Sequence, residues 1–170
     1  MRELTDKYLI CVSNFYPHKN LRRLILAFKK INLELGENYR LVIVGGNIYK
    51  EEENILITGC VDENRLNNLY RGADLCVLPS LYEGFGFPAL EAMKRGVAVV
   101  SSGSSCLKEI LGEAALYFNP LDVDDMAEKI KKALLDKGLR ENLINKGLER
   151  VKIYNWIKTA EETLDIYRTI

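Results

Sequence analysis

Short apolar runs that alternate with amphipathic stretches constrain the fold of this chain more than any other feature of its 170 residues. Runs with apolar side chains at consecutive positions predict strands that are buried on both faces of a parallel sheet. Helices between them would cover both faces. The pattern therefore predicts an α/β domain: a three-layer αβα, Rossmann-like, doubly wound sheet of about six strands. The expected strands cover residues 8–12, 41–44, 55–58, 75–78, 97–100 and 115–118.

The stretches between the strands have apolar residues at helical spacing and carry typical helix-end residues. Asp62 can cap a helix, and Pro88 suits a first helical turn. Gly45 and Gly46 are expected to end the second strand. Helices are predicted over residues 21–35, 65–71, 88–94, 107–111, 122–135, 139–151 and 156–167. Trp156 and Tyr167 are expected to pack the last helix on its neighbours.

The charge balance excludes a protein that works through a global electrostatic field. Lys plus Arg equals Asp plus Glu, 24 of each. Nucleic acid and an anionic membrane are therefore not expected partners, and any anion site must be built locally. The apolar runs are far shorter than the ~20 residues of a membrane span. Residues 1–7 are polar, unlike a signal peptide. We expect a cytoplasmic domain.

Cysteine and histidine are too few and too scattered for a structural metal site. The four cysteines form no C-x-x-C pair, and His18 is the one histidine. Cys11 and Cys76 lie inside apolar strand-like runs. Free thiols in a reducing compartment are the expected state, with these two buried. No metal site is predicted.

The segment between residues 79 and 93 is the most informative part of the chain, because in this fold ligands bind outside the carboxyl ends of the strands. It leaves the fourth strand, turns at Gly84 and Gly86 and enters a helix. The glycines allow close backbone approach to a ligand, and a helix N-terminus attracts phosphate. Glu83 and Glu91 could bracket a polyol, because carboxylates accept hydrogen bonds from hydroxyl groups.

Two other phosphate-binding patterns are disfavoured. Gly84-x-Gly86-x-x-Ala89 is similar to a dinucleotide fingerprint, but that fingerprint belongs in the first strand-to-helix turn with an acidic residue ~20 positions later. A nicotinamide or flavin enzyme is therefore a minor alternative. The P-loop sequence G-x-x-x-x-G-K-[ST] does not occur, although Lys19 could meet a diphosphate from the first loop.

The chain resembles the C-terminal donor-binding domain of the retaining GT-B glycosyltransferases, the group 1 or family 4 enzymes, and the mannosyltransferases among them. The resemblance spans roughly residues 8–168, and the pair of glutamates eight positions apart is its most specific part. The matching segments are PHKNL (17–21), LVIVG (41–45), GCV (59–61), LYRGAD (69–74), PSLYEGFGFP (79–88), LEAM (90–93), GVAVV (96–100) and AALYFNP (114–120).

The resemblance implies a role for each matching residue. Glu91 would hold the ribose hydroxyls, Glu83 would lie against the donor sugar, and Lys19 would contact the diphosphate. The two acids and the lysine thus form the expected donor site, in which Lys19 and Glu83 are the catalytic candidates. Further donor-binding candidates are Gly84, Phe85, Gly86, Asn20, His18, Gly59 and Val61. Relatives often have an arginine as a second diphosphate cation, and His18, Arg22 and Arg23 are alternatives for that charge here.

The resemblance also implies what the domain does and what it needs. It would bind a UDP- or GDP-sugar, without a metal or other cofactor, and transfer a hexosyl group with retention to a glycan or glycolipid acceptor. The acceptor would be bound by an N-terminal domain or a partner subunit absent from this single domain of residues 1–170, so the chain alone would be inactive. The last helix, 156–167, would lean towards that domain and expose apolar surface. Peripheral membrane association of the full enzyme is a further expectation.

Two other classes of protein remain open at this point. The chain could be a non-catalytic module that binds sugar nucleotides without turning them over. It could also be a receiver-like or scaffold domain with a similar sheet. Titration with nucleoside diphosphates separates these, because a scaffold would bind none of them.

Overall fold

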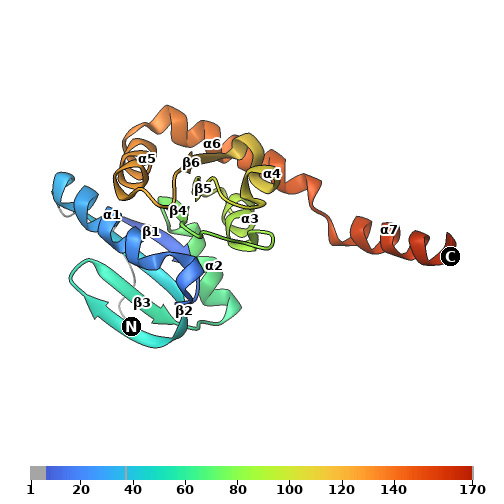
Figure 1. The fold of residues 1–170 in the computed structure, drawn as a ribbon, viewed down its shortest axis with the longest axis horizontal. Helices are drawn as coiled ribbons and strands as arrows, with labels where there is room; N and C mark the ends of the chain where they lie inside the picture. The colour runs from blue at the N-terminus through green and yellow to red at the C-terminus, as the bar shows by residue number, and fades with distance from the viewer. Residues whose placement is uncertain (1–6, 37, 170) are drawn as a thin grey trace.

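The computed structural model of the chain describes residues 7–36 and 38–169; the polar segment of residues 1–6 lies outside the described residues. Six strands form one sheet in the order β3-β2-β1-β4-β5-β6 (Figure 1). This is the strand order of the doubly wound dinucleotide-binding fold, so the predicted fold class is confirmed. The strands are β1 (Lys7–Val12), β2 (Tyr39–Glu52), β3 (Ile55–Gly59), β4 (Leu75–Leu78), β5 (Val99–Ser102) and β6 (Ala115–Phe118).

The strand order brings two distant loops together. The chain moves outward from β1 to β3 and then returns to the other side of β1, where β4 pairs with it in parallel. The strand order therefore reverses between β1 and β4. Loops that leave the carboxyl ends of such a pair diverge to opposite faces of the sheet and leave a crevice, which is the usual ligand position in this fold.

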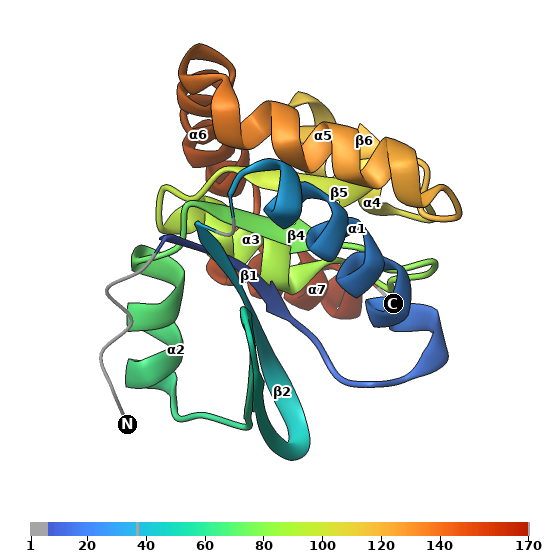
Figure 2. The ribbon, with the colours of Figure 1, turned by 90° about the vertical axis from the view of Figure 1, so that its left-hand side faces the viewer.

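Helices cover both faces of the sheet (Figure 2). The side chains of β1 alternate between two cores: Leu9 and Cys11 pack under α1 and α5, and Tyr8 and Ile10 pack under α2, α3 and α4. Fully apolar strands thus fill both cores, as the consecutive apolar positions predicted. The helices are α1 (Leu21–Glu34), α2 (Glu63–Arg71), α3 (Phe87–Lys94), α4 (Leu107–Leu111), α5 (Val123–Leu135), α6 (Lys137–Arg150) and α7 (Trp156–Thr169).

Strand β2 does not end at Gly45-Gly46, and that prediction is wrong. The strand continues to Glu52, with positive φ angles of 126° at Gly45 and 76° at Gly46. Its first part runs parallel to β3, whereas Lys50 lies opposite Ile57 and Glu52 opposite Ile55, in reverse order. The glycines therefore turn the strand back along β3 rather than end it, since glycine adopts positive φ at little cost.

Strand β5 lies two residues later than predicted, at Val99–Ser102 instead of 97–100. The amide of Val97 instead donates to the carbonyl of Ala92 at 3.0 Å, which completes the end of α3. Ser101 and Ser102 are fully buried, and their hydroxyls donate to backbone carbonyls. Serine usually lies at the surface, so the sequence pattern placed these residues in a loop.

Helix α7 projects away from the rest of the domain (Figure 1), and none of its residues is buried. Trp156 is 76% exposed and Tyr167 is 72% exposed. The prediction that these two residues pack the helix on its neighbours is therefore wrong for Tyr167, while Trp156 stacks on one ring, that of Phe87. The helix carries an uncovered apolar surface, as the resemblance implied. Among the described residues, no helix is long and apolar enough to cross a membrane.

Candidate functional site

The loop after β1 is tied to the loop after β4 by a buried asparagine. Asn20 separates the 3-10 turn η1 (Pro17–Lys19) from α1 and has a left-handed φ of 57°. Its side-chain amide donates to the carbonyl of Pro79 at 3.0 Å and to that of Pro120 at 2.7 Å. Two buried carbonyls from other loops are thereby satisfied. Asn20 fixes the position of its neighbour Lys19 at the end of β4.

Lys19 and Glu83, 64 residues apart in sequence, form an ion pair at this edge of the sheet. The ammonium Nζ of Lys19 lies 2.8 Å from both carboxylate oxygens of Glu83. The two side chains are only 18% and 10% exposed. The thiol of Cys11 at the end of β1 has its pKa raised to about 12, by burial first and by the charge of Glu83 second. The charged pair therefore lies close to the end of β1, as the strand order requires.

A second side chain donates a hydrogen bond to the same carboxylate. The hydroxyl of Ser80, which is fully buried, donates to Oε1 of Glu83 at 2.7 Å. The backbone of Glu83 is held from the loop after β5, where Ser105 Oγ lies 3.1 Å from its amide nitrogen and the thiol of Cys106 lies 3.2 Å from its carbonyl oxygen. Glu83 is therefore fixed by contacts from three loops rather than left free in solvent.

The two glycines of this segment differ in what the fold demands of them. Gly86 has a φ of 93°, and a β-carbon there would lie 2.6 Å from Cδ2 of the fully buried Leu107. The fold itself thus requires glycine at position 86. Gly84 has no positive φ, and a β-carbon there would meet no atom within 4 Å. Its missing side chain leaves open space beside Glu83, where a ligand could approach the backbone.

Glu91 lies on α3, about one turn after the start of the helix. The phenol of Tyr70 on α2 is fully buried, and its pKa is raised by burial, by the nearby Cys76 and by Glu91. Arg95 donates to the backbone carbonyl of Glu91 at 2.8 Å and lies over the Tyr70 ring at 5.0 Å. Glu91 is thus half-buried beside a tyrosine and an arginine. Among the described contacts, none links Glu91 directly with Lys19 or Glu83.

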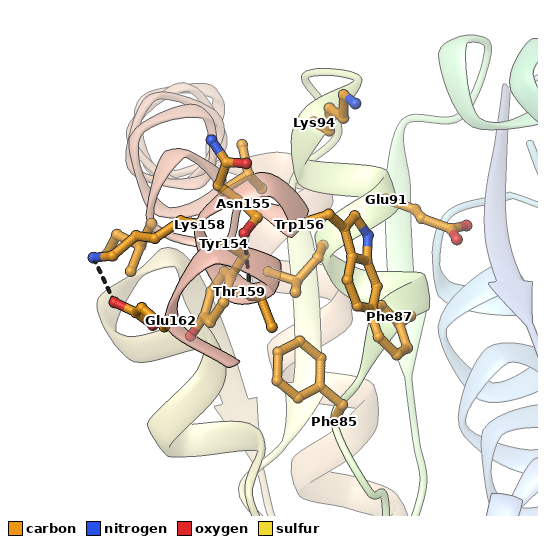
Figure 3. Close-up of a pocket in the computed structure, with 13 residues that line it drawn as sticks. Phe85, Phe87, Glu91, Lys94, Tyr154, Asn155, Trp156, Lys158, Thr159 and Glu162 are labelled. Atoms are coloured by element: carbon orange, nitrogen blue, oxygen red, sulfur yellow. Dashed lines mark hydrogen bonds and ion pairs between the residues drawn. The ribbon is translucent and has the colours of Figure 1, made fainter. Parts of the chain in front are cut away.

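A cavity of about 540 Å³ lies next to this site, between α3 and the start of α7 (Figure 3). Four aromatic rings contact each other in its wall. The ring centroids of Phe85 and Phe87 lie 4.8 Å apart, and those of Phe85 and Tyr154 lie 5.4 Å apart. The ring of Phe87 stacks on that of Trp156, with 6.1 Å between the centroids. Glu91 also lines the cavity, but Figure 3 shows its carboxylate pointing away from the rings. The aromatic wall and the acid therefore face different directions.

The remaining predicted donor-binding residues occupy varied positions. His18 is exposed and stacks on Tyr16 at 5.9 Å, and its backbone carbonyl accepts a hydrogen bond from the amide of Leu81 at 2.7 Å. Gly59 ends β3 with a φ of 67°, and Val61 is half-buried just beyond it. Within the described parts of the chain, no group of three or more His, Cys, Asp or Glu could hold a metal ion.

Two residues of the site escaped prediction from the sequence. One feature of the sequence could have indicated Ser80: its hydroxyl stands just after the fourth strand, three residues before Glu83. No such feature indicates Tyr70, because its position reads as the apolar face of an amphipathic helix. The Ser80 hydroxyl donates to the Glu83 carboxylate and the Tyr70 hydroxyl donates to the backbone carbonyl of Pro88 at 3.2 Å. The sequence does not reveal which acceptor such a hydroxyl meets.

Comparison with known proteins identifies the family. A family model described as glycosyl transferases group 1 matches residues 2–150. The chain belongs to the group 1 glycosyltransferase family. The match includes the loop after β1, the two glutamates and all six strands. This family membership confirms the resemblance that the motif around Glu83 and Glu91 indicated.

The relatives of this group 1 glycosyltransferase domain are about twice as long or longer. The O-antigen chain mannosyltransferase B of Escherichia coli is 33% identical over 96% of this chain, which spans 46% of that relative. Sucrose-phosphate synthase from Thermosynechococcus elongatus has a TM-score of 0.83 and 26% identity over 97% of this chain and 45% of its own. An Escherichia coli structure described as trehalose-6-phosphate bound with UDP-2-fluoro glucose has a TM-score of 0.83, 16% identity and coverages of 97% and 44%. At that identity it supports the fold alone.

Proposed function

We propose that this domain binds a nucleoside-diphosphate sugar and forms the donor half of a two-domain retaining glycosyltransferase. The ion pair between Lys19 and Glu83 carries the proposal. It joins a cation from the loop after β1 with an acid from the loop after β4, at the point where the strand order reverses. A diphosphate needs the first group and a sugar can use the second.

Each group has a chemical task in this proposal. Cleavage of the sugar–phosphate bond develops negative charge on the departing diphosphate. Lys19 and the N-terminus of α3 stabilise that charge, and such a contribution is typically worth ~3 kcal/mol in a transition state. Glu83 binds sugar hydroxyls and Glu91 binds the ribose. The backbone at Gly84 faces the ligand, and the loop from Gly59 to Val61 borders the base.

The donor and acceptor are proposed from the relatives. The name of the Escherichia coli mannosyltransferase supports a mannosyl or other hexosyl group, transferred to a growing glycan or glycolipid in polysaccharide biosynthesis. Membership of the group 1 glycosyltransferase family supports a nucleoside-diphosphate sugar as the class of donor, with UDP and GDP both open. We propose a cytoplasmic location and peripheral membrane association of the full enzyme, in keeping with these acceptors.

The exposed apolar surface of α7 supports a partner for this domain. Trp156, Ile157, Ile166 and Tyr167 are all exposed on one short helix, and exposed apolar patches commonly mark interaction surfaces. The relatives contain more than half their length beyond the matched region. We propose that α7 contacts an acceptor-binding domain, in the same chain or in a partner subunit.

A thermal-shift screen with UDP-, GDP- and ADP-sugars tests the donor proposal. At one hundred times the dissociation constant, a ligand should stabilise the domain by ~2.7 kcal/mol. Calorimetry with the best ligand then tests Glu91→Ala, which should weaken binding by ~1–3 kcal/mol because polar groups of the ribose lose their partner. Glu162→Ala is the matched control, since Glu162 lines the same cavity from α7 and pairs with Lys158 at 3.7 Å. Failure of every sugar nucleotide to bind would refute the proposal.

A further inference from the structure

Ser80 is placed to control Glu83 without meeting the ligand itself. It is the second residue after β4 and is fully buried. Its backbone carbonyl accepts a hydrogen bond from the hydroxyl of Ser102 at 2.6 Å, and Ser102 is itself fully buried at the end of β5. The serine is therefore fixed to the edge of the sheet, and its hydroxyl is aimed at Oε1 of Glu83 at 2.7 Å.

The two donors on the Glu83 carboxylate differ in mobility. Lys19 reaches it through a long, flexible side chain from the loop after β1. Ser80 reaches it through one rotatable bond from the same loop as Glu83. A hydroxyl that donates to a carboxylate makes a charge-assisted hydrogen bond, which is about twice as strong as a neutral one. Ser80 can hold the carboxylate in place when Lys19 moves.

The difference in mobility between Lys19 and Ser80 matters once a sugar nucleotide binds; this step rests on the proposed function. A diphosphate that binds Lys19 competes with Glu83 for the same ammonium group, which both carboxylate oxygens now contact. Ser80 is then the donor to the Glu83 side chain that remains among the described contacts. We infer that Ser80 is a positioning residue that holds the Glu83 carboxylate against the donor sugar once the diphosphate engages Lys19.

The inference separates the sugar from the diphosphate in binding measurements. Calorimetry of the chain compares UDP with UDP-glucose and GDP with GDP-mannose, and the ratio of the two affinities gives the contribution of the sugar. Ser80→Ala should lower the affinity for the preferred sugar nucleotide about tenfold, the loss expected for a hydrogen bond to a charged group. It should leave the affinity for the diphosphate within about twofold.

Matched variants keep the result interpretable. Ser101→Ala removes an equally buried hydroxyl from the neighbouring strand, where it donates to the carbonyl of Ser102 rather than to Glu83, so both affinities should be unchanged. Ser80→Cys keeps nearly the same size with a weaker donor, and serves in the same comparison if the alanine variant does not fold. An intermediate loss of the sugar contribution in Ser80→Cys supports the inference.

Each outcome decides one question. If no nucleoside diphosphate or sugar nucleotide binds the wild-type chain, the proposed function fails and this inference fails with it. If the wild type binds the sugar nucleotide more tightly than the diphosphate and Ser80→Ala keeps that advantage, only the role of Ser80 is refuted. Equal affinity of the wild type for both ligands, or an equal loss for both in Ser80→Ala but not in Ser101→Ala, also overturns the inference.

Discussion

Glu83→Gln should make the domain bind a nucleoside diphosphate more tightly, although it alters a residue of the proposed site. In the free protein the charge of Lys19 is neutralised by Glu83, which contacts it through both oxygens at 2.8 Å. A diphosphate must displace Glu83 from this lysine and bind close to a carboxylate of like charge. Glutamine retains an oxygen for the Ser80 hydroxyl but carries no charge. The cation is then free for the ligand.

The geometry of the pair sets the size of the effect. At 2.8 Å, Coulomb's law with an effective dielectric constant of about 20 gives an attraction of about 6 kcal/mol. Desolvation of two largely buried groups cancels most of it. Exposed pairs contribute ~0–1 kcal/mol and broken buried pairs cost ~3–5 kcal/mol, so this part-buried pair lies between these limits, at about 1–2 kcal/mol. Its removal should strengthen UDP or GDP binding roughly tenfold.

Calorimetry with UDP and GDP, repeated with the corresponding sugar nucleotides, measures this directly. The gain should be greatest for the diphosphate, and the extra affinity from the sugar should fall because Glu83 no longer accepts hydroxyl hydrogen bonds. Glu113→Gln is the control: Glu113 pairs with Lys146 at 2.8 Å, but its side chain is 87% exposed, and the substitution changes net charge equally. Weaker diphosphate binding in Glu83→Gln than in wild type would show that the acid and the diphosphate do not compete for Lys19.

Three further substitutions or measurements test the structure around the site. Gly86→Ala should destabilise the domain by ~2–4 kcal/mol in urea unfolding, because alanine is strained at a positive φ and overpacks against Leu107. Gly84→Ala should leave the stability within ~0.5 kcal/mol of wild type but weaken ligand binding. Equal stability of the two variants would contradict this reasoning. Asn20→Ala should cost ~2–4 kcal/mol, because two buried carbonyls lose their donor, and a loss below ~1 kcal/mol contradicts that role. Iodoacetamide should label the exposed Cys60 in the native protein. It should label Cys11 only after the chain unfolds, because that thiol is buried and its pKa is raised to about 12. Mass spectrometry identifies the labelled cysteine, and labelling of Cys11 in the native protein would contradict the fold.

The fold could be predicted from the sequence because its signal is local. Apolar runs identify strands one by one, and helix caps such as Asp62 are recognisable from a few residues; its side chain does accept a hydrogen bond from the amide of Arg65. The ends of β2 and β5 were misplaced because glycines can turn a strand as well as end it and because buried serines are satisfied by carbonyls from other loops. Those events depend on tertiary partners.

The candidate site was only partly predictable, since it depends on which strands are neighbours. The sequence identified Lys19, Glu83 and Glu91 separately, through the family motif. Their proximity follows from the position of β4 beside β1, which fixes Lys19 against Glu83 but leaves Glu91 on the next helix. The packing of Tyr167 on neighbouring helices was predicted wrongly for a related reason, because an amphipathic pattern shows that a face will be covered but not what covers it.

The segment between β4 and α3 makes contacts in three directions, so its residues cannot be treated as independent. Glu83 contacts Lys19, Gly86 packs on Leu107, and Phe85 lies against Tyr154 near the start of α7. We expect a substitution at any one of them to shift the backbone that positions the other two, because effects of neighbouring residues that share partners do not add. Binding and stability should therefore be coupled here, and a double substitution of Glu83 and Phe85 should deviate from the sum of the single ones by ~0.5–3 kcal/mol. Full additivity would mean that Glu83 and Phe85 act independently. The start of α7 would then have no influence on the donor site.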